Sequence, residues 1–175
     1  MEDIYEPEED SYLILNFLPL YAPGKRILDM GTGSGVLALE CLRFSNDVVA
    51  ADVNPAALNM AKRKLGTRAL VIESDLFSRI QRKFDLILFN PPYLPNAPYG
   101  TKATDGGKRG SELIAKFLKQ AGNHLDPGGI ILLVFSSLTK KREVDMLIKE
   151  NGFKSKTLAE KHLFYETLYL YELKK

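Results

Sequence analysis

Short, almost wholly apolar runs alternate with helix-like segments along most of this chain, and this alternation restricts the fold more than any other feature. The runs expected to be strands are residues 26–30, 47–52, 69–72, 84–89 and 130–135. The segments expected to be helices are residues 36–44, 55–65, 111–124 and 140–150. Strands that alternate with helices form βαβ units, and strands without polar alternation are buried on both faces of a parallel sheet.

Two further strands are expected near the carboxyl terminus, at residues 154–163 and 166–173, and the short connection between them predicts antiparallel pairing. The sequence therefore predicts an α/β, Rossmann-like fold: a seven-stranded, mainly parallel sheet with one antiparallel strand and helices on both faces. The alternating Tyr165, Tyr169 and Tyr171 are expected to pack in this sheet. A ligand is expected at the carboxyl ends of the strands, where the strand order reverses.

Bulk composition indicates one globular domain, because the 175 residues are 45% hydrophobic and 26% charged. The single cysteine, Cys41, lies in an apolar run and is expected in the core, so neither a disulfide nor a metal site is predicted. The acidic amino-terminal segment does not resemble a signal peptide, and no apolar run approaches the roughly 20 residues that span a membrane. We therefore expect a cytoplasmic protein with no membrane partner.

A glycine-rich turn follows the first expected strand. Gly31, Gly33 and Gly35 allow the backbone to approach a ligand closely, where a Cβ would collide with it. Asp52 ends the second strand, and a carboxylate at that place suits a ribose diol. Thr32 within the turn and Val53 beside Asp52 are predicted to belong to the same cofactor site. A tight strand-to-helix turn with an acidic cap is the structural alternative.

Several acidic residues narrow the choice of nucleoside cofactor. Asp29 can receive an ammonium group, Asp75 can accept from an adenine amino group, and Leu76 offers a backbone donor and an apolar wall. The turn lacks the lysine of a phosphate-binding loop, and Val36 stands where a dinucleotide fingerprint needs Gly or Ala. An ammonium, a diol and an adenine amine together match S-adenosylmethionine.

The stretch Asn90-Pro-Pro-Tyr93 follows the fourth expected strand and resembles the signature of class I S-adenosylmethionine-dependent methyltransferases that act on amino or amide nitrogens. Two more stretches, YEPEEDSYLI (5–14) and DGGKRGSELI (105–114), resemble the HemK-like release-factor glutamine N5-methyltransferases, in particular their short eukaryotic and archaeal branch. The resemblance covers nearly the whole chain, so residues 1–175 are expected to form a single methyltransferase domain.

This resemblance implies a substrate and partners. The expected substrate is the glutamine of a Gly-Gly-Gln loop in a class 1 release factor, and a small zinc-binding activator subunit is an expected partner. Residues 1–23 would close over the cofactor, with Glu9, Asp10 and Ser11 at its methionine end. Asn90, Pro91, Pro92 and Tyr93 would hold the substrate amide, and Asn90 would also contact the cofactor. Ser11 stands where Thr is common in the family, and Asp105 where Ala is common.

The chemistry explains why an amide and two prolines suit this position. A glutamine amide nitrogen is a poor nucleophile because its lone pair is delocalised into the carbonyl. The side-chain oxygen of Asn90 and the backbone carbonyl of Pro91 can accept from its two N–H groups, which localises the lone pair. The prolines fix φ at two successive residues, so the acceptors are rigid before the substrate arrives. Tyr93 can lie flat against the planar amide.

Two further segments are expected to make contacts. The long connection 94–109 is expected to be a substrate loop, with a solvated insertion as the alternative. The apolar strand 68–72 is expected at an edge of the sheet, where an activator subunit or a second copy of the chain would cover it.

Two other functions fit parts of the sequence. An enzyme that methylates adenine N6, cytosine N4 or guanine N2 could use the same Asn-Pro-Pro-Tyr stretch, but the net charge of +2 argues against a nucleic-acid substrate. A non-catalytic subunit with the same fold is the second alternative, and the intact Asn-Pro-Pro-Tyr stretch argues against it.

Overall fold

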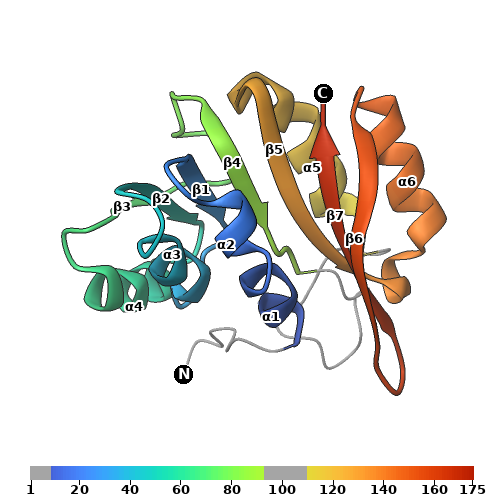
Figure 1. Cartoon of the computed structure of the whole chain (residues 1–175), viewed down its shortest axis with the longest axis horizontal. Helices are drawn as coiled ribbons and strands as arrows, with labels where there is room; N and C mark the ends of the chain where they lie inside the picture. The colour runs from blue at the N-terminus through green and yellow to red at the C-terminus, as the bar shows by residue number, and fades with distance from the viewer. Residues whose placement is uncertain (1–8, 93–109) are drawn as a thin grey trace.

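The computed structural model describes residues 9–92 and 110–175, and these form a seven-stranded sheet in the order β3-β2-β1-β4-β5-β7-β6 (Figure 1). The strands are β1 (Arg26–Met30), β2 (Asp47–Asp52), β3 (Leu70–Glu73), β4 (Phe84–Phe89), β5 (Leu125–Ser136), β6 (Lys154–His162) and β7 (Thr167–Lys174). Of these strands, only β7 runs antiparallel to its neighbours, β5 and β6. The predicted fold class is confirmed, including the single antiparallel strand and the edge position of β3.

Helices cover both faces of this sheet. They are α1 (Glu9–Leu15), α2 (Leu18–Tyr21), α3 (Val36–Cys41), α4 (Pro55–Leu65), α5 (Glu112–Ala121) and α6 (Lys141–Glu150), with 3-10 turns η1 (Gly122–His124) and η2 (Ser137–Thr139). One core cluster packs helices α1, α2, α3 and α4 against one face of the sheet. A second cluster packs α5 and α6 against the other face. Cys41 is fully buried in the first cluster, as predicted, and burial raises the pKa of its thiol.

The strand expected at residues 130–135 starts earlier than predicted, because β5 already begins at Leu125. Phe84 pairs with Leu125 and Leu86 pairs with Ile130, so the four intervening residues of β5 bulge out of the ladder. A Cβ on Gly129 would lie 2.9 Å from the carbonyl oxygen of Asp126, which explains the glycine there. The sequence therefore predicted this strand but placed its start after the bulge instead of before it.

Helices α1 and α2 were not predicted. Leu13 and Ile14 of α1 and Leu18 of α2 are buried, and the four-residue spacing of Ile14 and Leu18 is the helical signal that could have indicated this segment. The hydroxyl of Tyr21 donates to Glu172 of β7 at 2.7 Å and ties this segment to the far side of the sheet. Burial and the Glu172 carboxylate raise the pKa of Tyr21 to about 12.

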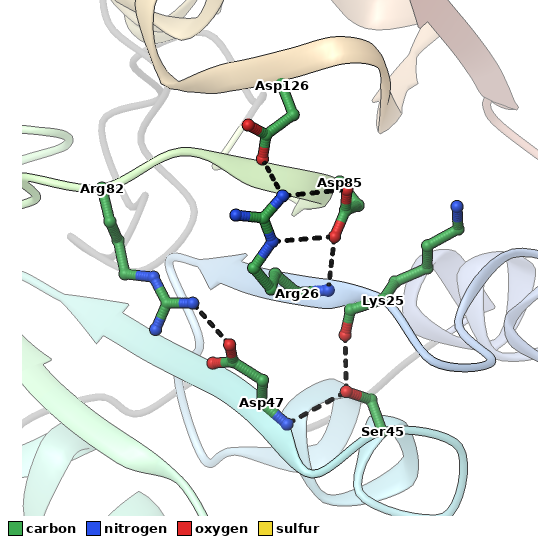
Figure 2. A network of polar contacts seen from close by, with 7 residues as sticks. All are labelled: Lys25, Arg26, Ser45, Asp47, Arg82, Asp85 and Asp126. Carbon is green, nitrogen blue, oxygen red and sulfur yellow. Dashed lines mark hydrogen bonds and ion pairs between the residues drawn. The ribbon is translucent and has the colours of Figure 1, made fainter.

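Polar contacts join the amino ends of the central strands (Figure 2). Arg26 of β1 contacts Asp85 of β4 at 3.1 Å and Asp126 of β5 at 2.7 Å, the latter as an ion pair rather than an aligned hydrogen bond. Arg82 contacts Asp47 of β2 in the same group. The Arg26 guanidinium holds the pKa of Asp85 below its usual range. These side chains join neighbouring strands at the end of the sheet opposite the predicted site.

The predicted packing of the tyrosines holds for two of the three. Tyr169 and Tyr171 stack on or meet Phe135, with ring centroids 5.3 and 4.9 Å apart. Tyr165 instead lies in the β6–β7 connection and is 86% exposed, so its prediction is wrong: the strand alternation ends before it.

Within residues 9–92 and 110–175, none of the helices has the length and apolar character needed to cross a bilayer.

Candidate active site

Strand register brings Gly31, Asp52 and Asn90 to one level at the carboxyl ends of three adjacent strands. Met30 of β1 is the parallel partner of both Ala51 of β2 and Phe89 of β4, and the three predicted residues come immediately afterwards. Neighbouring strands lie about 4.8 Å apart, so Asp52 and Asn90 flank Gly31 at close range. Strand order reverses between β1 and β4, the place where ligands of open α/β sheets bind.

The glycine-rich turn is held open at its first glycine. Gly31 has a φ of +68°, and a Cβ built there would meet no atom of the described residues within 4 Å. The backbone N–H groups of Gly31 and Thr32 both donate to the carbonyl of Ala51, at 2.8 and 2.9 Å, which anchors the turn to β2. Unfilled space above an anchored left-handed turn suits a ligand that contacts backbone.

Gly35 has a different reason to be glycine. Its φ is +81°, and a Cβ there would lie 3.1 Å from both the Cα and the Cβ of Ala61 in α4. The residue lets α3 and α4 pack closely, as the third glycine of such turns does. Packing alone therefore explains Gly35, and the cofactor contact expected of it stays a prediction.

Asp29 braces the turn from below. Its side chain is 1% exposed, and Oδ2 accepts from the hydroxyl of Thr32 at 2.6 Å and from the N–H of Ala38 at 3.0 Å. Burial raises the pKa of Asp29 to about 6, although both hydrogen bonds oppose this. A cationic group placed beside Asp29 would favour the ionised form, as expected for the ammonium of the predicted cofactor.

The raised pKa of Asp29 predicts how the stability of the ligand-free chain depends on pH. The folded state favours the protonated acid, so this stabilising contribution is complete below about pH 4 and is lost as pH rises through about 6. The Asp29→Asn variant keeps an acceptor oxygen at this position but does not titrate. We expect the difference in unfolding free energy, wild type minus variant, to fall by on the order of 2 to 3 kcal/mol between pH 4 and 7. Urea unfolding of both proteins across this range measures it, and parallel curves would contradict it.

Asp52 is oriented by two backbone donors. Oδ2 accepts from Gly33 N–H at 2.8 Å and Oδ1 accepts from Asn54 N–H at 2.9 Å. A carboxylate offers about four lone-pair positions, so acceptor capacity remains for a diol. Val53 follows with 64% of its surface exposed, an unusual position for a branched apolar side chain and one that fits a wall of a ligand site. The roles predicted for both residues stay predictions.

The turn after β3 carries local strain. Leu76 is buried yet has a φ of +47°. Residues other than glycine seldom adopt this left-handed backbone conformation, and those that do cluster at functional sites. The buried hydroxyl of Ser74 donates to the Leu76 carbonyl at 2.6 Å and accepts from Arg79 N–H at 3.1 Å, which holds this conformation. Asp75 lies exposed between them. Ser74 was not predicted, although a serine opening a tight turn is its usual signal.

Asn90 leaves one acceptor without a partner. Its Nδ2 donates to the hydroxyl of Ser11 at 3.4 Å, which directs the amide oxygen away from α1. That oxygen, Oδ1, is buried and has no hydrogen-bond partner in the part of the chain that the structure describes. Buried acceptors in proteins are nearly always satisfied, so an unpaired one at a strand end indicates a place for a donor from a ligand.

Helix α1 brings the predicted amino-terminal residues to this point. Ser11 and Asp10 are 4% and 3% exposed, and Asp10 Oδ1 accepts from the Ser11 N–H at 2.6 Å. Glu9, at the start of the helix, forms an ion pair with Lys161 of β6. Pro91 is buried and Pro92 half-buried. Tyr93, the loop 94–109 and residues 1–8 lie outside the described residues.

The order of these groups fits S-adenosylmethionine. Leu76 and Asp75 follow β3, Asp52 ends β2, the open turn at Gly31 follows β1, and Asn90 follows β4. Across three strand spacings of about 4.8 Å each, the residues predicted to contact the adenine, the ribose, the cofactor backbone cradle and the substrate amide follow one another in that order. The unfilled space at Gly31 and the unpaired Asn90 oxygen are the two observations that this cofactor and an amide substrate would explain.

The fold and this site define a methyltransferase. Residues 6–167 match the family model of the methyltransferase small domain, and the chain belongs to that family. It is 37% identical to a putative protein N5-glutamine methyltransferase of Methanocaldococcus jannaschii over 95% of this chain and 89% of that protein. It is 30% identical to the human methyltransferase HEMK2 over 95% of this chain and 87% of the relative. Membership of the predicted HemK-like group is thereby confirmed.

A solved structure agrees with these relatives. The E. cuniculi Mtq2–Trm112 complex, which is responsible for methylation of the translation termination factor eRF1, contains a chain that superposes on this one with a TM-score of 0.81. The two chains are 27% identical, and the match covers 98% of each.

Proposed function

We propose that this chain transfers a methyl group from S-adenosylmethionine to the N5 nitrogen of a glutamine in the Gly-Gly-Gln loop of a class 1 release factor. One observation carries the proposal: the buried, unpaired Oδ1 of Asn90 stands beside the open Gly31 turn at the reversal of strand order. An amide NH2 supplies the donor that this oxygen lacks. The similarity to N5-glutamine methyltransferases supports an amide substrate over a nucleobase.

The residues of the chain position and activate the nitrogen. Asn90 Oδ1 accepts from one N–H of the substrate amide, and the Pro91 carbonyl accepts from the other, so electron density stays on the nitrogen. Ser11 fixes the direction of the Asn90 amide through their hydrogen bond. S-adenosylmethionine, when bound, supplies a methyl group that its sulfonium already activates. Positioning of this kind can contribute about 7–11 kcal/mol toward the barrier.

Mapping methyl groups by mass spectrometry tests the proposal. The chain is incubated with labelled cofactor and, separately, with a class 1 release factor, the same factor carrying Gln→Ala in its Gly-Gly-Gln loop, and structured RNA. We expect label only on the intact factor, and only on that glutamine. Label on the RNA or on another residue of the factor would reject the proposed substrate.

The exposed edge of β3 supports a second part of the proposal, a partner subunit. Among the described strands, β3 pairs only with β2, and Leu70 at its start is 55% exposed. A strand with a free edge and an apolar surface is a template for another chain. The similar Mtq2 structure was solved as a complex with Trm112. We infer that a Trm112-type subunit covers β3 in this protein.

Charge placed on this edge should therefore weaken the complex. We expect Leu70→Lys to lower the affinity for a Trm112-type subunit by at least about tenfold, because an ammonium would be desolvated at the interface. Met146→Lys, at a similarly exposed apolar position on α6, serves as the matched control. Calorimetric titration measures both variants. Unchanged affinity for Leu70→Lys would exclude β3 as the interface, and a stable dimer of the unmixed chain would point to a second copy as its cover.

A further inference from the structure

The tip of the β6–β7 hairpin carries two large aromatic side chains in full contact with solvent. Phe164 and Tyr165 are 89% and 86% exposed, the highest values among the large apolar side chains of the described residues. Their rings meet edge to face, with centroids 4.6 Å apart. Neither ring contributes to the core, so packing gives no reason for this pair.

The type of turn does not explain the aromatic pair either. The Leu163 N–H donates to the Glu166 carbonyl at 2.8 Å, which closes a two-residue connection. Such connections favour Gly, Asn or Asp, because they often need a left-handed backbone. Phe164 and Tyr165 are not among the residues with positive φ. The backbone of this turn therefore accepts large residues but does not require them, and an exposed aromatic pair without a packing role indicates a contact with another molecule.

The tip lies at the same end of the sheet as Asn90. Figure 1 shows the β6–β7 connection projecting past the other strands at the end where α1 lies. Asn90 follows Phe89, whose partner is Leu133, and the next level of the sheet pairs Val134 with Leu170. Tyr165 precedes Leu170 by five residues, which places it about 16 Å beyond Asn90 along the strands and about 10 Å to the side.

The hairpin is braced against the catalytic residues. Lys161 of β6 forms an ion pair with Glu9, the first residue of α1. Two residues along, Ser11 receives the hydrogen bond of Asn90. At the base of the hairpin, the Thr167 N–H donates to Ser137 at 3.0 Å. These contacts join the hairpin to α1 and to η2, beside the predicted substrate acceptor.

The charges around the tip favour a protein over a nucleic acid. Residues 160–167 contain two carboxylates, Glu160 and Glu166, against one ammonium, Lys161, which already pairs with Glu9. One oxygen of Glu166, Oε2, is buried and has no partner in the described part of the chain. The exposed carboxylate of Glu160 and the lack of an unpaired ammonium among these residues would disfavour phosphates, so we take the partner to be a protein.

We propose that Phe164 and Tyr165 are a second docking point for the protein substrate. The contact lies about 20 Å from the modified amide, a distance that about six extended residues would span. The substrate surface that it fits is an apolar patch of the folded factor, remote from the methylated loop. This inference rests on the proposed function and adds a specificity element to the same site.

Steady-state kinetics on two substrates test the docking point. The substrates are the full-length release factor and a peptide with three residues on each side of its glutamine, which is too short to reach the tip. For the double variant Phe164→Ala/Tyr165→Ala, we expect KM for the full factor to rise about tenfold with kcat nearly unchanged. The KM for the peptide should stay the same, as should both constants for the control Met146→Ala.

Each other outcome contradicts the inference. An unchanged KM for the full factor would reject docking at the tip while leaving the proposed function intact. A wild-type chain that methylates no release factor would reject both. If the peptide is no substrate, equal dissociation constants of wild type and double variant for the full factor would reject the contact. Loss of RNA binding, or dissociation of a dimer of the chain, in the double variant would assign the tip to a different ligand.

Discussion

Replacing Asn90 by alanine should lower kcat for methyl transfer about a hundredfold to a thousandfold, as removal of a single preorganised hydrogen-bonding group commonly does in enzymes. The Asn90→Ala variant loses the acceptor that holds one N–H of the substrate amide. The cofactor turn at Gly31 does not depend on this side chain, so the affinity for S-adenosylmethionine should change far less than kcat. Single-turnover methylation and calorimetric binding of the cofactor measure the two quantities.

An asparagine remote from the site supplies the matched control for Asn90→Ala. Asn151 follows α6, and its side chain donates to the Leu147 carbonyl at 2.8 Å. Asn151→Ala should leave kcat within about twofold of the wild type, since it removes only a local contact. A similar fall in kcat for both variants would show that the effect is structural. Full activity of Asn90→Ala would reject the role of the unpaired oxygen.

Gly31→Ala and Gly35→Ala should differ in the property that each changes most: cofactor affinity for Gly31→Ala and stability for Gly35→Ala. Both glycines have positive φ, so each substitution costs about 1–2 kcal/mol through the backbone. At Gly35 the new Cβ also meets Ala61 at 3.1 Å, and overpacking adds about 1–3 kcal/mol. At Gly31 the Cβ enters open space, so only the backbone cost applies. Gly35→Ala should therefore be the less stable of the two, by about 1–3 kcal/mol.

For cofactor affinity we expect the opposite order, with Gly31→Ala affected more than Gly35→Ala. The Gly31→Ala methyl group would occupy the space assigned to S-adenosylmethionine, and we expect its dissociation constant to rise at least about tenfold. The added methyl group of Gly35→Ala faces α4, so the folded variant should bind the cofactor nearly as well as the wild type does. Urea unfolding and calorimetric titration on the same preparations give both numbers. Unaltered affinity in Gly31→Ala would place the cofactor elsewhere.

The main features of the fold could be predicted because the strands are locally distinct. Apolar runs buried on both faces, such as Asp47–Asp52, have no competing helical pattern, and Asn54 with Pro55 gives α4 an unambiguous start. Gly31, Asp52 and Asn90 could be placed together for a related reason. Each lies at the end of a parallel strand, and the carboxyl ends of parallel strands meet at one edge.

Features that depend on contacts between distant segments could not be predicted. Ser11 and Asn90 are 79 residues apart, and Glu9 and Lys161 are 152 apart, so no local pattern indicates either pair. Tyr165 continued an alternation that the chain itself breaks at the hairpin. The residues after His124 carry turn chemistry, yet pairing with β4 draws them into a strand with a bulge.

The cluster around Arg26 at the amino ends of the strands has a consequence for how this architecture diversifies. Charged side chains join the central strands on the side remote from the predicted site. Segments on the opposite rim can then be lengthened or exchanged without disturbing strand alignment. One scaffold can in this way offer the same nitrogen-binding site to very different macromolecules. Substrate selectivity then depends on the segments at the carboxyl ends of the strands.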